Sequence, residues 1–401
     1  MPKPSPQGPT NGFRASRQIE RITVSYSYPV HFVRDAFSKD NKLIASLALS
    51  TGESGPFRVL FFLDSGVHEA FPDLAGQLED YARAHPEALA LAGPVQAVPG
   101  GEAAKMSAEP LMAALDAMAR ARLCRHSFVV AVGGGSVLDV VGMAASLVHR
   151  GLRLIRFPST VLSQCDAGVG VKNGINAYGA KNFLGSFAPP FAVVNDSRLL
   201  TTLPQDHWIG GAAEAFKVAI IKDRAFFNWL ARNAELLAGR DLNAMEHLVK
   251  KAAKSHLDHI ATSGDPFEFG CARPLDFGHW SAHRLEVLSN YEMGHGQAVS
   301  VGIALDCVYA EQEGLLSHAE LKKVLAALSR AGLPVFSTLL EARTPEGKLA
   351  VLKGLTDFRE HLGGELTVTL PDGLGKKIEV HAMNEAVIEQ SVMHLKKLAA
   401  P

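Results

Sequence analysis

The stretch SFVVAVGGGSVLDVVGMAASLVHRGLRLIRFPST (127–160) decides the fold. Its first part, SFVVAV (127–132), is a continuous apolar run of strand length that ends at the glycines of 133–135. The following SVLDVVGMAASLVH (136–149) has the apolar spacing of a helix, and RLIRF (153–157) predicts another buried strand. Strand, glycine turn, helix and strand form a βαβ unit, which predicts a parallel sheet with helices on both faces.

The alternation of strand and helix extends upstream, and a different pattern follows downstream. RVLFFLD (58–64) predicts a buried strand, and Ser107 can cap a helix that runs through Arg122. After about residue 205, helical patterns dominate, and ELTVTLP (365–371) is the next strong strand pattern. The predicted helices cover 210–222, 224–238, 242–262, 276–289, 296–313 and 318–331. We predict a disordered tail over 1–17, an α/β nucleotide-binding domain over 18–200 and a mostly helical domain over 201–401.

Composition excludes several classes of protein. The 401 residues carry 40 basic and 41 acidic side chains, a balance that argues against a nucleic-acid binder or an anionic-membrane binder. No apolar run reaches the roughly 18 residues that a membrane span requires. The four cysteines are far apart, which predicts neither a disulfide framework nor a cysteine zinc site. We expect a cytoplasmic protein, with Cys124, Cys165, Cys271 and Cys307 as small apolar residues.

The glycine turn at 133–135 is a candidate phosphate site, because backbone N–H groups and the helix dipole converge where a strand leads into a helix. It is not a GxGxxG fingerprint, so a plain tight turn explains it equally. Asp139 could complement the positive end of that helix. Asp64, Glu102 and Lys105 could hydrogen-bond ribose hydroxyls, or they could be ordinary surface charges. The segment 158–187 interleaves polar side chains with glycines and apolar residues, which predicts a loop lining a cleft.

The helical half carries a candidate metal site. Glu214 and Lys217 are three residues apart, and His279 and His283 are four apart, so each pair lies on one helix face. A carboxylate and two imidazoles from separate helices suit a divalent metal with one open coordination position, as catalytic zinc requires. HxxxH by itself is weak, since a satisfied core histidine is more common. Glu214 and His295, taken together with His279, favour a metal.

Several segments, in this order, resemble motifs of the sugar phosphate cyclases, the superfamily of 3-dehydroquinate synthase. They are GGGSVLD, PSTVLSQCDAGVGVKNGIN, AKNFLGSF, GGAAEAFK, DFGHWSAH and HGQA. The resemblance implies an α/β nucleotide-binding domain with a parallel sheet, followed by a helical metal-binding domain. It also implies NAD, a divalent metal (zinc or cobalt), a small sugar phosphate as substrate, and a homodimer.

The resemblance also implies site residues, position by position. The implied metal ligands are Glu214, His279 and His295. The implied NAD contacts are Asp64, Glu102, Lys105, Gly134, Gly135, Ser136, Asp139, Ser159, Thr160, Lys172 and Lys181. The implied phosphate contacts are Arg150, Lys172, Asn182, His283 and Lys376, with Arg150 reaching across the dimer interface. Asp166, Lys217 and Glu268 would contact the sugar hydroxyls or the metal-bound centre, and Asp276 also belongs to the implied site.

In this superfamily, NAD transiently oxidises a secondary alcohol that the metal polarises, phosphate leaves by β-elimination, hydride returns, and an enol closes the ring. The substrate end of this chain departs from 3-dehydroquinate synthase. Counting back from His279 places Asp258, Ala272 and Asp276 where that enzyme carries the Lys, Arg and Asn that bind a carboxylate. The DFGHW sequence is more similar to the branch that cyclises sedoheptulose 7-phosphate, the 2-epi-5-epi-valiolone synthase type, and to a bacterial branch from ebo gene clusters. We therefore expect a neutral seven-carbon sugar phosphate as substrate.

Alternatives remain open. Arg273 could replace the missing cations, which would restore 3-dehydroquinate synthase activity. A metal-dependent alcohol or glycerol dehydrogenase shares the architecture, but usually has P-T-T-A-G-T-G-S-E where this chain has PSTVLSQCDAGVG. A non-catalytic NAD-binding relative would lack the intact metal and phosphate residues. Asn173, where relatives have Thr after the lysine, is a further departure.

Overall fold

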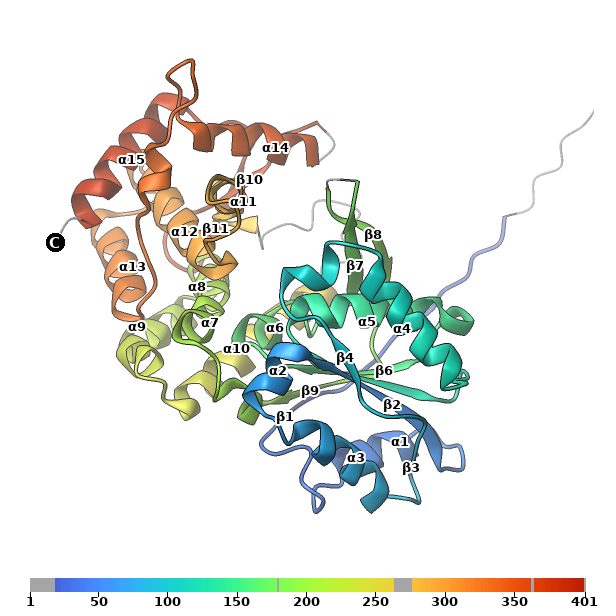
Figure 1. The fold of residues 1–401 in the computed structure, drawn as a ribbon. Helices are drawn as coiled ribbons and strands as arrows, with labels where there is room; N and C mark the ends of the chain where they lie inside the picture. Colours follow the sequence, from blue (N-terminus) through green and yellow to red (C-terminus); the bar gives the residue numbers. More distant parts are fainter. Residues whose placement is uncertain (1–18, 179, 263–275, 362–363, 400–401) are drawn as a thin grey trace, which may run out of the picture.

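The computed structural model describes residues 19–178, 180–262, 276–361 and 364–399. Figure 1 shows two parts, an N-terminal part built on a sheet and a C-terminal part built of helices. The predicted fold class, a parallel-sheet α/β domain followed by a mostly helical domain, is confirmed. Among the described residues, no helix is both long enough and apolar enough to span a membrane.

The sheet of the N-terminal part is parallel, with strand order β1-β9-β6-β5-β2-β3 and with β4 also pairing with β2. Its strands are β1 (Val30–Val33), β2 (Phe57–Asp64), β3 (Leu89–Leu91), β4 (Gln96–Val98), β5 (Phe128–Gly133), β6 (Arg153–Pro158) and β9 (Ala192–Asp196). The helices beside it are α1 (Leu43–Leu49), α2 (Ser65–Ala70), α3 (Leu74–Ala84), α4 (Glu109–Arg120) and α5 (Gly135–Leu147). The βαβ unit predicted from 127–160 is β5-α5-β6.

Strand β5 shows why its sequence is apolar throughout. Phe128 and Val130 pack in the core cluster that holds residues of α1 and α3, whereas Val129 and Ala131 pack in the cluster that holds residues of α4 and α5. Both faces of the strand are therefore covered, so no position alternates to a polar residue. The glycine turn follows the carboxyl end of this buried strand, so it lies at the edge of the sheet where ligands bind in such folds.

The C-terminal part packs its helices around one large apolar core. Helices α8, α9, α10, α11, α12 and α13 correspond to the predicted ones. The elements are α7 (Gln205–Gly210), α8 (Ala212–Lys222), α9 (Arg224–Ala238), α10 (Leu242–Thr262), α11 (His279–Leu288), α12 (His295–Gln312), α13 (His318–Arg330), α14 (Lys353–His361), β10 (Val368–Pro371), β11 (Lys377–Val380) and α15 (Glu385–Ala399). Helix α12 is buried on nearly all sides and contacts α7, α8, α11, α13 and α15.

The segment 158–187 corrects one prediction, because most of it is regular structure and not a loop. After the short helix α6 (Val161–Cys165), β7 (Lys172–Ala177) and β8 (Ala180–Phe187) form an antiparallel hairpin. Glycines and asparagines interrupt these two strands, so their sequence lacks the regular alternation of apolar and polar residues that is typical of a strand. In Figure 1 the hairpin projects from the N-terminal part next to the helical part.

Candidate active site

The three predicted metal ligands converge from three helices. Glu214 lies on α8, while His279 and His295 begin α11 and α12. Both imidazole Nε2 atoms approach Glu214 Oε1, at 3.6 Å from His279 and 3.5 Å from His295. One ligand atom from each residue lies within 4.8 Å of the others. This arrangement suits a single divalent ion with a position left for substrate.

The protonation states of His279 and Glu214 also fit a cation. The Nδ1 atom of His279 lies 3.0 Å from the Phe277 carbonyl, which can only accept, so Nδ1 carries the proton and Nε2 presents a lone pair to the site. Burial, with Lys217 nearby, lowers the pKa of His279 to about 3. Within the described part of the chain, both oxygens of Glu214 are buried without a hydrogen bond of good geometry, although the Lys217 ammonium contacts one of them. Burial opposes ionisation of Glu214, but Lys217 and the two histidines hold its pKa well below its usual value.

Glu286 on α11 is a residue of this site that the motifs did not identify. Its Oε1 lies 3.4 Å from His295 Nδ1 and 3.5 Å from the Lys181 ammonium. Burial opposes ionisation of Glu286, yet His295 and Lys181 lower its pKa to about 2. Burial also opposes protonation of His295, but Glu214 and Glu286 raise its pKa to about 9. A sequence pattern could have indicated it, because Glu286 follows His279 by seven residues, two helical turns along the same face.

Lys217 lies among carboxylates. It contacts Glu214, and the charges of Asp166 and Asp276 also act on it, so its pKa is raised although burial works against this. Lys217 is 2% exposed. The predicted residues Asp166, Lys217 and Asp276 are thus brought to the metal ligands, with acidic groups in excess.

His256 on α10 is the second residue that sequence reasoning missed. Its Nδ1 lies 2.8 Å from Asp166 Oδ1. Burial raises the pKa of Asp166, but the contact with His256 outweighs burial and lowers this pKa to about 2. The count back from His279 placed Asp258 where 3-dehydroquinate synthase carries a carboxylate-binding lysine. In the structure Asp258 is exposed and pairs with Lys254 one turn away, whereas His256 faces Asp166. Residues two apart on a helix point in different directions, so only one of them reaches the site.

Arg156 of β6 is fully buried and holds the segment 166–173, which runs from the end of α6 to the start of β7. Its guanidinium donates to the carbonyls of Gly168 (3.4 Å), Gly170 (2.9 Å) and Lys172 (3.1 Å) and to Asn173 Oδ1 (2.5 Å). The departure at Asn173 is thereby explained, since its amide oxygen completes the arginine's set of acceptors.

The glycine turn sits where a dinucleotide phosphate would be expected. A Cβ at Gly133 would meet Val137 at 2.8 Å, so packing requires glycine there. At Gly134 and Gly135 the nearest atoms would be 3.5 and 3.6 Å away, which are ordinary contacts. Packing leaves these two glycines unexplained, whereas close approach of a ligand to the backbone explains them.

The polar side chains around this turn bond to one another and to the backbone in separate groups. Asp64 accepts the Gly66 N–H at 2.8 Å and the Gly134 N–H at 3.2 Å. Lys105 donates to Asp139 Oδ2 at 2.7 Å and contacts Asn182 of the hairpin. Separately, the Ser136 hydroxyl donates to Glu102 Oε1 at 3.0 Å.

The remaining predicted residues lie at different places. Ser159 is buried beside the turn, and Thr160 caps α6. Lys172 and Lys181 are exposed on the hairpin. The centroid of the His283 ring lies 5.4 Å from that of His279 and 6.0 Å from that of His295. Lys376 is exposed in a turn that Gly375 fastens to α8. Arg150 is exposed after α5, and Glu268, with Cys271, Ala272 and Arg273, lies outside the described residues.

Comparison with known proteins agrees with this geometry. Residues 95–210 match the family described as 3-dehydroquinate synthase N-terminal, and residues 211–351 match 3-dehydroquinate synthase C-terminal. The 3-dehydroquinate synthase of Vibrio atlanticus is 31% identical over 93% of this chain and 98% of its own length. The chain belongs to the 3-dehydroquinate synthase family. The predicted membership of this family of sugar phosphate cyclases is confirmed.

Two further relatives belong to the branch that the DFGHW motif resembled. The 2-epi-5-epi-valiolone synthase of an Actinoplanes species is 32% identical over 96% of this chain and 93% of its own length. The solved structure of ValA, a 2-epi-5-epi-valiolone synthase from Streptomyces hygroscopicus with NAD+ and Zn2+ bound, superimposes with a TM-score of 0.81. That match has 29% identity and covers 95% of this chain and 100% of ValA. The family therefore includes an enzyme whose structure contains both cofactors.

Proposed function

We propose that this protein is an NAD- and metal-dependent cyclase that releases phosphate from a seven-carbon sugar phosphate, with sedoheptulose 7-phosphate as substrate. The observation that carries the proposal is the convergence of Glu214, His279 and His295 beside Lys217 and Asp166. The likeness to 2-epi-5-epi-valiolone synthases over nearly the whole chain supports it.

The residues present fit both cofactors. Among the described residues, Glu214 has buried oxygens without good hydrogen bonds beside two imidazole Nε2 atoms. Gly134 and Gly135 leave room for a phosphate close to the backbone, with the Gly134 N–H held by Asp64. When bound, the metal supplies a Lewis acid, and NAD+ supplies a hydride acceptor that returns the hydride within the turnover.

The chain's own residues bind and orient the sugar. Lys217 presents donors and Asp166 presents acceptors next to the metal ligands, as a polyol with adjacent hydroxyls requires. Lys172, Asn182, His283 and Lys376 surround the phosphate in our proposal, joined by Arg150 of a second subunit. Lys181 joins the hairpin to the helical part through Glu286, which holds both halves of the site in register.

The substrate preference follows from charge. The charge of Asp276 acts on Lys217, together with those of Asp166 and Glu214. The count back from His279 places Asp276 at a position where 3-dehydroquinate synthase is implied to bind a carboxylate. A carboxylated substrate would meet repulsion in place of a charge-assisted hydrogen bond, which is worth about 1.5–3 kcal/mol. One such loss corresponds to about one to two decades in kcat/KM. A neutral heptulose phosphate avoids this penalty.

The decisive experiment measures phosphate release and NADH together. We would incubate the protein with NAD+, Zn2+ or Co2+, and either sedoheptulose 7-phosphate or the seven-carbon acid phosphate used by 3-dehydroquinate synthase. We expect phosphate release from the neutral sugar without net NADH, and none from His279→Ala. Faster release from the acid would establish 3-dehydroquinate synthase activity, net NADH from an alcohol would establish a dehydrogenase, and NAD binding without turnover would establish a non-catalytic relative.

A further inference from the structure

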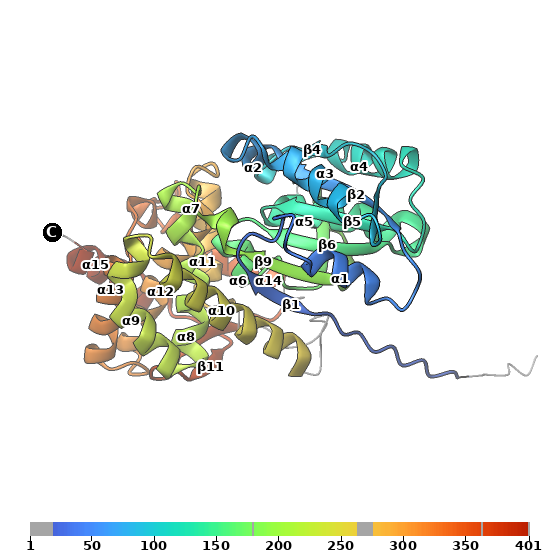
Figure 2. The same cartoon turned by 90° about the horizontal axis from the view of Figure 1, so that it is seen from below.

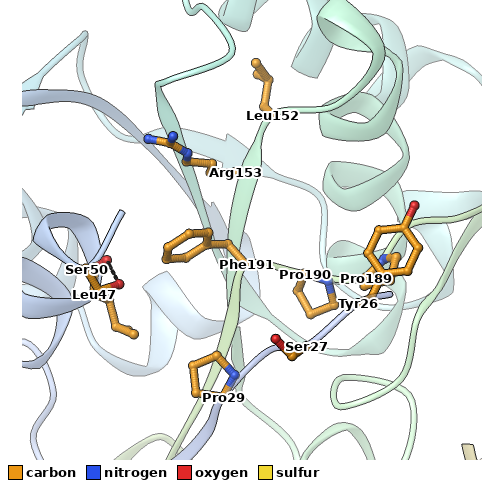
Figure 3. A pocket seen from close by; sticks show the side chains of 10 residues that line it. All are labelled: Tyr26, Ser27, Pro29, Leu47, Ser50, Leu152, Arg153, Pro189, Pro190 and Phe191. Carbon is orange, nitrogen blue, oxygen red and sulfur yellow. Dashed lines mark hydrogen bonds between the residues drawn. The ribbon is translucent and has the colours of Figure 1, made fainter. Parts of the chain in front are cut away.

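The metal ligands His279 and His295 begin two helices that lie side by side. Figures 1 and 2 show α11 next to α12 in the helical part of the molecule. A cavity of about 500 Å³ lies elsewhere, beside Phe191 and at the edge of the sheet where β6 and β9 begin (Figure 3). Its lining residues belong to the N-terminal part, whereas the groups behind the two histidines belong to the helices themselves.

Helix α12 buries a carboxylate among apolar side chains. Asp306 is fully buried, and it is the only charged side chain among the buried residues that the structure describes on this helix. The metal ligands and sugar contacts named above do not include it. Burying a carboxylate is costly unless hydrogen bonds compensate, so a carboxylate kept in the core of a helix indicates a specific role.

Asp306 binds the residues on both sides of His279. Its Oδ2 accepts the Gly278 N–H at 3.0 Å, and its Oδ1 accepts the Trp280 indole N–H at 2.8 Å. Gly278 is the N-cap residue of α11 and has no side chain that could cap the helix, so Asp306 supplies an acceptor there from the neighbouring helix. The start of α11, which carries the metal ligand, is thereby tied to α12.

The bond to Gly278 continues to the imidazole of His279. The Gly278 N–H and the Phe277 carbonyl belong to one peptide group, and His279 Nδ1 donates to that carbonyl at 3.0 Å. A chain of hydrogen bonds therefore runs from the Asp306 carboxylate through this peptide group to His279, whose Nε2 faces Glu214. Hydrogen bonds in series polarise one another, so the charge of Asp306 makes the carbonyl a stronger acceptor. A stronger acceptor at Nδ1 fixes the ring and raises the basicity of the ligating nitrogen.

Close packing holds Gly278 in place. Its φ is +78°, and a Cβ there would meet the Ile303 backbone nitrogen at 2.8 Å. A Cβ at Gly302 would clash with the Gly278 carbonyl oxygen. Gly302 lies about one turn before Asp306, and His295 lies about three turns before it, so all three share one face of α12. A single helix therefore carries one metal ligand and holds the backbone next to the other.

We propose that Asp306 is a positioning residue for the metal ligand His279 and acts on it through the Phe277–Gly278 peptide group. The carboxylate contacts the backbone and the indole that flank the histidine, so it sets the direction of His279 Nε2 and its strength as a ligand. This inference rests on the metal site of the proposed function and not on the identity of the sugar.

The test compares two buried aspartates in the metal-free chain. Asp306→Asn removes the charge and keeps the shape, and Asp196→Asn makes the same change in the N-terminal part, where Asp196 accepts three backbone N–H groups. Zinc is titrated at a pH above the pKa of Asp306, which burial raises to about 7 against the effect of its two hydrogen bonds. We expect Asp306→Asn to raise the Zn2+ Kd about tenfold and Asp196→Asn to leave it unchanged.

The absorption spectrum of bound Co2+ separates positioning from a structural role. Its visible bands depend on the geometry of the ligands, so at saturating Co2+ they should differ between Asp306→Asn and the wild type. A role in folding alone would lower the urea unfolding midpoint of both aspartate variants and leave the Co2+ spectrum of the folded protein as in the wild type.

A second pair of variants tests the bond to Trp280. Trp280 and Trp208 are equally buried, and each indole N–H donates at 2.8 Å, to Asp306 and to the Leu237 carbonyl respectively. Trp280→Phe should raise the Zn2+ Kd about threefold, half of the free-energy effect expected for Asp306→Asn, whereas Trp208→Phe should leave it unchanged. Equal Zn2+ Kd values for these two variants would overturn the proposal.

The aspartate pair can overturn it as well. A wild-type Kd or a wild-type Co2+ spectrum for Asp306→Asn, or an equal change in Asp196→Asn, would refute the positioning role and leave the proposed function intact. A wild-type chain that binds no zinc would overturn the proposed function itself, and this inference with it.

Discussion

Replacing Asn173 by alanine tests how the segment 166–173, which carries Asp166 and Lys172, is held in place. Asn173 is 5% exposed, and its Oδ1 accepts from the buried guanidinium of Arg156 at 2.5 Å. Its amide nitrogen has no hydrogen-bond partner among the residues that the structure describes, so the side chain acts through its oxygen. A hydrogen bond to a charged group contributes about 1.5–3 kcal/mol, and Asn173→Ala should lower the free energy of unfolding by about this amount. Asn173→Asp keeps the acceptor and adds a charge opposite Arg156, so it should stay within about 1 kcal/mol of wild type.

The assay is urea unfolding followed by far-UV circular dichroism, together with kcat/KM for phosphate release. Asn173→Ala should unfold at a lower urea concentration and have a lower kcat/KM, because the same contact fixes the segment 166–173, which carries Lys172. Asn173→Asp should recover both quantities. Equal losses in the two variants, or a wild-type midpoint for Asn173→Ala, would show that the oxygen of Asn173 does not hold Arg156 in the way described.

Other consequences can be measured in the same preparations. Glu286→Gln should weaken metal binding about 10- to 100-fold in a Zn2+ titration, since an outer partner that orients a ligating histidine is lost. Burial raises the pKa of Asp306 to about 7 from its ordinary 3.8, despite hydrogen bonds that lower it, so the folded chain holds a proton that the unfolded chain releases. Stability contributed by this proton, on the order of 4 kcal/mol, should therefore be lost as pH rises from about 4 to 7, and melting curves of Asp306→Asn should show a smaller fall across that window. His256→Ala should reduce kcat/KM about tenfold by freeing Asp166, without changing metal content, whereas Lys254→Ala should have no effect because its ion pair is exposed.

Much of this protein was predictable because its decisive residues are close together in the chain. The run 127–160 specifies strand, turn and helix locally, and β5, α5 and β6 form as expected. The spacing of Glu214 from Lys217, and of His279 from His283, fixes which side chains share a helix face. These elements and helix faces follow from the periodicity of the backbone alone, so they can be predicted from the sequence.

The tertiary structure alone decided which distant residues meet. His256 contacts Asp166 although 90 positions separate them. Arg156 donates hydrogen bonds to three backbone carbonyls and to Asn173 in the segment 166–173. Asp258, two residues after His256, faces solvent and pairs with Lys254, since a helix rotates each successive side chain by about 100°. Helix packing sets the rotation of α10 against the loop, and packing depends on the whole core. Local sequence therefore determined the elements and their ligand-bearing faces, while the packing of α10 and the loop determined the contacts that complete the site.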